Sequence, residues 1–132
     1  MFYKGYNGNY ESVQLIQTSF FQDLLTRFKE CIANDKIIGK LEEDCKTAGM
    51  SSSECAKAKT SEQNRLKFTF YSGHDMSIAA MAAFMELTQF GDSPPFASTF
   101  FFKLKATNET LTGNEADYFV EVLLNGATVI TF

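Results

Sequence analysis

The sequence has little of what several common functions require: of its 132 residues, one is histidine, two are arginine and three are cysteine. It also lacks a long apolar run, since the best candidate, residues 76–90, includes four polar side chains. A membrane-spanning helix needs about 18 or more apolar residues, so no membrane span is expected. The opening residues, MFYKGYNGNY, contain no apolar stretch of the kind found in a secretory signal.

Positive charge is also scarce. The net charge is −4, the sequence pI is about 5.0, and Arg27 and Arg65 are accompanied by ten lysines spread thinly along the chain. Proteins that bind nucleic acid usually carry a basic face. No nucleic-acid partner is therefore expected.

The cysteines do not follow a metal-binding pattern. There is no CxxC pair and His74 is the only histidine, so the usual zinc-ligand spacing is missing, and no metal or cofactor is expected. Cys31 falls on the apolar face of a predicted helix and is expected to be a buried thiol. In an oxidising compartment Cys45 and Cys55 can form a disulfide, which for so short a loop contributes roughly 2 to 3 kcal/mol.

The composition, 45% hydrophobic and 14% aromatic, predicts a single globular domain over residues 1–132. Residues 11–34 are predicted to form an amphipathic helix, because apolar side chains recur at intervals of three and four. The apolar face consists of Val13, Ile16, Phe20, Leu24, Phe28, Cys31 and Ile32.

Residues 35–65 are polar and much longer than an ordinary connection of about 4 to 6 residues, which predicts an insertion. Two short helices are expected within it, over residues 36–46 and 53–64. The second has the spacing of a capping box at its start, with Ser51 three residues before Glu54.

Residues 66–90 are predicted to form a strand, a tight turn and a helix. Apolar residues alternate with Lys67, Thr69 and Tyr71 before the turn, which is the period of a strand. Residues 76–90 are apolar nearly all round a helix, so this helix is expected to be covered by protein on most sides.

His74 and Asp75 lie where this helix is predicted to begin. The first N–H groups of a helix point outward and its dipole favours negative charge, so an imidazole and a carboxylate at this place can serve an anion. Two simpler interpretations remain open. Asp75 can be the helix N-cap, and His74 can be a hydrogen-bonded histidine of the core.

The C-terminal part predicts β structure and completes an α/β fold. Residues 98–105 include three successive phenylalanines, which favours a central strand covered on both faces. Residues 118–124 and 127–132 are predicted to pair as a hairpin. The Asn125-Gly126 pair between them supplies the two positive-φ residues of a type I′ turn.

Three segments resemble the histidine acid phosphatases, a branch of the histidine phosphatase superfamily. Residues 71–80, YSGHDMSIAA, resemble the family's "YSxHDTTIxx". Residues 94–98, PPFAS, resemble "PPYAS", and residues 118–126, YFVEVLLNG, resemble "YFVxVxYNG". The segments occur in the family's order and span about half of the chain, residues 67–126.

The resemblance implies hydrolysis of a phosphomonoester through a phosphohistidine. By position, His74 would contact the phosphate and Asp75 would protonate the leaving alcohol. Ser77 takes the place of one of two family threonines and would offer a hydroxyl to the phosphate. The family fold is a phosphoglycerate-mutase-like sheet with flanking helices, here ending in a β-hairpin. A secreted or lysosomal protein is implied, and the sequon at Asn108 suits a glycoprotein.

Part of the family pattern is missing. The chain has no "RHGxRxP" segment and no second histidine for the nucleophile, and Lys103 replaces an acidic residue. We therefore expect the C-terminal half of such a phosphatase, inactive alone and prone to self-association, with the missing N-terminal half as its partner. Two alternatives remain: an inactive family member with a structural role, and a module that binds a phosphorylated ligand at His74 without cleaving it.

Overall fold

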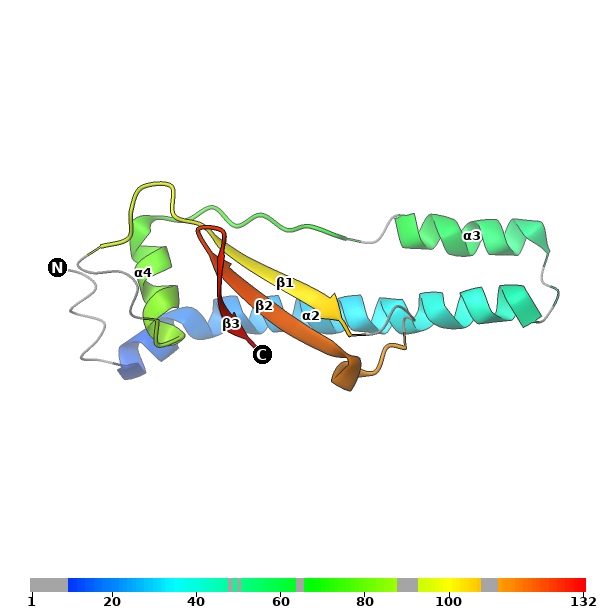
Figure 1. Ribbon diagram of the computed structural model, residues 1–132, viewed down its shortest axis with the longest axis horizontal. Helices are drawn as coiled ribbons and strands as arrows, with labels where there is room; N and C mark the ends of the chain where they lie inside the picture. Colours follow the sequence, from blue (N-terminus) through cyan, green and yellow to red (C-terminus); the bar gives the residue numbers. More distant parts are fainter. Residues whose placement is uncertain (1–9, 48, 50, 64–65, 88–92, 108–111) are drawn as a thin grey trace. The chain divides into compact units, whose positions relative to one another are not determined.

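The computed structural model describes residues 10–47, 49, 51–63, 66–87, 93–107 and 112–132. The elements in chain order are the helices α2 (Tyr10–Thr47), α3 (Ser52–Gln63) and α4 (Asp75–Phe84), strand β1 (Phe100–Ala106), the 3-10 helix η1 (Glu115–Asp117), and strands β2 (Tyr118–Leu124) and β3 (Ala127–Thr131) (Figure 1). The protein is therefore a mixed α/β structure. None of the helices in the described ranges combines the length and the apolar character needed to cross a membrane.

The strands form a three-stranded antiparallel sheet in the order β1-β2-β3. β2 pairs with β3, with Leu124 opposite Ala127 and an irregularity in register between Val122 and Leu123. Asn125 and Gly126 join the two strands with φ angles of 50° and 87°. The hairpin prediction is confirmed, because both residues have the positive φ that a type I′ turn requires.

The chain divides into two compact units, each made of separate stretches. The first contains residues 1–25, 70–103 and 120–132, and the second contains residues 26–69 and 104–119. Three elements, α2, β1 and β2, contribute to both units.

The core of the first unit lies between α4 and the sheet. Ala79 and Ala82 of α4 are buried together with Leu87 and Leu124. Half-buried apolar side chains pack around these four: Ile78, Met85, Phe100, Val129 and Ile130. Aromatic rings of α2 extend this core, since Phe21 stacks on Phe84 with ring centroids 4.4 Å apart.

The second unit is organised around the middle of α2. Ile32 and Ile38 are buried there, and the buried carboxylate of Asp35 accepts a hydrogen bond of 3.0 Å from the Tyr118 hydroxyl. Gly113 approaches α2 so closely that an added Cβ would lie 2.1 Å from the Cβ of Lys36. This unit is therefore closed by contacts between residues far apart in sequence.

The N-terminal helix is longer than expected. The sequence predicts one helix over residues 11–34 and another over residues 36–46, whereas α2 runs unbroken from Tyr10 to Thr47. At the junction of the two predicted pieces, Asp35 has a weak helix preference, and its carboxylate accepts a hydrogen bond from Tyr118 that favours its place in α2. The second predicted helix of the insertion is confirmed as α3, with Glu54 Oε2 accepting from the Ser51 N–H at 3.3 Å.

Two β predictions are wrong. Residues 66–71 form no strand, and their apolar side chains are exposed, with Phe68 at 69% and Phe70 at 77%. Alternation provides two faces, but a strand also needs a neighbour for its backbone hydrogen bonds, and no described strand pairs with this segment. The second error concerns β1, which lies at the edge of the sheet with Phe101 exposed rather than at its centre.

Candidate functional site

Helix α4 begins at the pair of residues that the sequence singles out. His74 is the N-cap, with extended backbone angles of φ −109° and ψ 172°. Its carbonyl oxygen accepts hydrogen bonds from the N–H groups of Ser77 at 3.0 Å and Ile78 at 3.2 Å. The interpretation of Asp75 as the N-cap is therefore wrong, since Asp75 is already the first helical residue.

The carboxylate of Asp75 lies against the first turn of α4. Its Oδ1 accepts a hydrogen bond of 2.8 Å from the N–H of Met76, and the side chain is exposed. A negative charge in the first turn interacts favourably with the helix dipole. Among the described residues, the hydrogen bonds of Asp75 involve only Oδ1, which leaves Oδ2 without a partner there.

His74 is exposed. The interpretation as a core histidine is therefore wrong for this structure, because a core imidazole would be enclosed by protein. Since His74 and Asp75 are consecutive, an imidazole and a carboxylate both reach solvent at the start of one helix.

Ser77 contributes to the helix start itself. Its Oγ accepts a hydrogen bond of 3.4 Å from the His74 N–H, which closes the reciprocal half of a capping box. Gly73 makes this approach possible, because a Cβ at position 73 would lie 3.1 Å from Ser77 Cβ and 3.2 Å from its Oγ. The hydroxyl expected to meet phosphate is thus engaged with the backbone of His74.

The segment that leads into His74 is fastened to α2. The Tyr71 hydroxyl donates to Asp23 Oδ2 at 2.5 Å, and the Tyr71 ring meets Phe20 edge-on with centroids 5.1 Å apart. Nothing in the sequence pattern marks Asp23 as a partner of Tyr71. No periodicity could have revealed it, since 48 residues separate the two side chains.

The buried face of α4 packs against the core and so fixes the position of the site. Its inward-facing residues, Ala79, Ala80, Ala82 and Ala83, are all at most 8% exposed. Small side chains allow the helix to approach the sheet closely, and they are uniformly buried. The start of α4 is therefore exposed, while the rest of the helix is firmly packed.

The second and third segments of the family resemblance meet in the structure. Asn125 Oδ1 accepts a hydrogen bond of 2.8 Å from the Thr99 N–H, and the Asn125 N–H donates to the Thr99 carbonyl at 2.9 Å. Nδ2 of the same asparagine reaches Ser98 Oγ at 3.4 Å. The first segment joins the third through the core, where Ala79 shares a cluster with Leu124.

The remaining predicted residues lie elsewhere. Cys45 and Cys55 form a disulfide in the second unit, and Cys31 is a free, half-buried thiol rather than a fully buried one. Asn108 and Arg65 fall outside the described residues. Within the ranges described, no three His, Cys, Asp or Glu residues are grouped as a metal site would require.

The arrangement can bind an anion and move a proton. The dipole of α4 favours negative charge at this end of the helix, and the imidazole of His74 beside it adds a hydrogen-bond donor. A carboxyl group at the same place can give a proton to a leaving oxygen. Comparison of the chain with protein-family models, with curated proteins and with solved structures finds no match.

Proposed function

We propose that this chain is the C-terminal part of a phosphomonoester hydrolase of the histidine acid phosphatase type. One observation carries the proposal: consecutive His74 and Asp75 stand exposed at the start of α4, within a segment that resembles the family's "HD" motif. The chain has the α/β class and the C-terminal hairpin that the proposal expects. Secretion or delivery to the lysosome belongs to the same proposal.

In this function His74 donates a hydrogen bond to a phosphate oxygen near the start of α4. The dipole of α4 favours the negative charge that spreads over the equatorial oxygens during transfer. Asp75, in its protonated form, gives its proton to the leaving alkoxide as the P–O bond breaks. Ser77 Oγ accepts a hydrogen bond from the His74 N–H and so helps to hold the backbone from which the imidazole extends.

The nucleophile has to come from other residues, because this chain contains no second histidine. An N-terminal half carrying "RHGxRxP" would supply it, together with arginines for the phosphate. That half would also cover the exposed apolar side chains of residues 66–70. The chain alone is expected to be inactive and prone to self-association.

The intact mass of the protein in its native source tests the proposal first. A species much heavier than the 14.8 kDa of this chain, with additional N-terminal sequence that contains the nucleophile motif, is the expected result. In that species Asp75→Asn should lower kcat by about 10² to 10⁴-fold, the range typical of a lost general acid. Asp44→Asn, at the end of α2, is the matched control and should leave kcat unchanged.

Two results would contradict the proposal. Phosphomonoesterase turnover by the pure 132-residue chain, abolished by Asp75→Asn, would show that no further half is needed. A native species of 14.8 kDa would favour a second function, binding of a phosphorylated ligand without cleavage. The lack of a second histidine supports that alternative, which predicts phosphate or vanadate binding that is lost in His74→Ala.

A further inference from the structure

Helix α3 has almost no apolar surface with which to pack. Its only apolar residues are Cys55, Ala56 and Ala58. All of its described side chains are exposed except that of Cys55, which is half-buried. A helix that is polar nearly all round gains little from burial and depends on other interactions to stay in place.

Local interactions stabilise α3 only modestly. Glu54 Oε2 accepts from the N–H of Ser51 at 3.3 Å and from its hydroxyl at 3.0 Å, and the Thr60 hydroxyl donates to the Ala56 carbonyl at 2.9 Å. These bonds all lie within α3 and its cap. A helix of 12 residues is marginal in water when no tertiary contact supports it.

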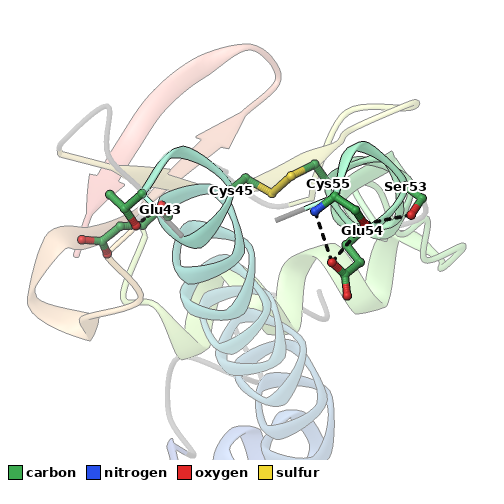
Figure 2. Close-up of a disulfide and its surroundings, with 7 residues drawn as sticks. Glu43, Cys45, Ser53, Glu54 and Cys55 are labelled. Carbon is green, nitrogen blue, oxygen red and sulfur yellow. Dashed lines mark hydrogen bonds between the residues drawn. A yellow bond between two sulfur atoms is a disulfide. The ribbon is translucent and has the colours of Figure 1, made fainter. Parts of the chain in front are cut away.

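The Cys45–Cys55 disulfide joins α3 to α2 within the second unit (Figure 2). Cys45 lies in the last turn of α2, and the two Cα atoms are 5.8 Å apart. The described side-chain hydrogen bonds near the facing ends stay within one helix: the Thr47 hydroxyl donates to the Glu43 carbonyl in α2, and the Thr60 hydroxyl donates to the Ala56 carbonyl in α3. The covalent link is therefore the chief restraint on the position of α3.

We infer that this disulfide makes α3 a redox-sensitive element of the fold: when the bond is reduced, α3 leaves α2 and loses much of its helical structure. A dithiol reductant carries out the step. It gives two electrons and two protons to the sulfur pair, so the S–S bond breaks, Cys45 and Cys55 become thiols, and the reductant becomes a cyclic disulfide. Both cysteines are only half-buried, which leaves the sulfur atoms within reach of a small thiol.

The effect of reduction is confined to one part of the chain. Between α3 and the candidate site, the hydrogen bond between Tyr71 and Asp23 holds the chain in place. The start of α4 is held separately by its own packing against the sheet. The conformation around His74 should therefore be the same in the oxidised and reduced protein, and the inference does not depend on the proposed function.

Hydrogen exchange followed by mass spectrometry tests the inference on the 132-residue chain. After reduction with dithiothreitol, amides of residues 52–63 should exchange at least about tenfold faster, because a short helix without tertiary support opens readily. Amides of residues 26–40 in α2 should keep their protection. Far-UV circular dichroism should lose about a fifth of its helical signal, since the three α-helices contain 38, 12 and 10 residues.

Cysteine variants provide the controls. Cys45→Ser combined with Cys55→Ser should show the fast exchange of α3 with and without reductant, whereas Cys31→Ser should respond to reductant as the unchanged chain does. Equal protection of residues 52–63 in both redox states would overturn the inference. So would loss of the response in Cys31→Ser, since it would place the responsible bond elsewhere.

Discussion

The turn between β2 and β3 permits a sharp test, because Asn125 has two separable roles. Its φ of 50° is in the left-handed region, where an alanine costs roughly 1 to 2 kcal/mol and an asparagine is tolerated. Its Oδ1 also accepts the hydrogen bond from the Thr99 N–H, and such a bond contributes about 0.5 to 1.5 kcal/mol net. Different substitutions at this one position remove one role or both.

Three variants should lose stability in a fixed order. Asn125→Asp keeps the acceptor oxygen and tolerates the backbone, so it should lose only about 0.5 kcal/mol or less. Asn125→Gly adopts the positive φ but loses the acceptor, for a loss of about 1 kcal/mol. Asn125→Ala loses the acceptor and is also strained, so the free energy of unfolding should fall by about 2 kcal/mol or more.

Urea unfolding followed by far-UV circular dichroism measures these differences at one protein concentration. Thr99→Ala is the control, because it retains the backbone N–H that Asn125 accepts and should cost much less than Asn125→Ala. An alanine variant as stable as the glycine variant would refute the backbone part of the reasoning. An aspartate variant as unstable as the glycine variant would refute the hydrogen-bond part.

Two further substitutions test the cores of the two units. Val122 is fully buried, so Val122→Ala should reduce the free energy of unfolding by about 2 to 3 kcal/mol. Val120 is half-buried, so Val120→Ala should reduce it clearly less in the same urea experiment. Equal losses in the two variants would contradict the packing of Val122. Gly113→Ala should cost about 2 to 4 kcal/mol, because its φ is +65° and the new Cβ would meet Lys36. Gly49→Ala has a similar φ of +61° but nothing within 4 Å, so it should show the backbone cost alone, and a loss as large as that of Gly113→Ala would rule out the steric contribution.

The features that the sequence predicts well are those decided by neighbouring residues. The Asn125-Gly126 pair in the sequence is enough to place the hairpin, and both residues have positive φ in the structure. The spacing of Ser51 and Glu54 was enough to place the start of α3. In each case the residues that form the structure are adjacent or three apart, so the pattern and its physical cause coincide.

Features that depend on distant partners escaped prediction. The continuous α2 passes through Asp35, whose carboxylate accepts a hydrogen bond from Tyr118, 83 residues away. The attachment of Tyr71 to Asp23 is a contact of the same kind. The alternation before His74 predicts a strand correctly only when another strand lies beside it, and the described residues contain none there. For the candidate site, local sequence located His74 and Asp75 but not the contact that secures them.

The alanine face of α4 restricts how this helix can change. Alanine has no side-chain rotamers to lose on burial, so these positions are occupied at little entropic cost. Replacement by glycine would weaken the helix by about 1 kcal/mol at each position, and a larger side chain would overpack the core by about 1 to 3 kcal/mol. Both smaller and larger side chains are therefore disfavoured at these positions. The buried alanines therefore keep α4 close to the sheet, and the position of His74 and Asp75 at the start of α4 should vary little among sequence variants that fold.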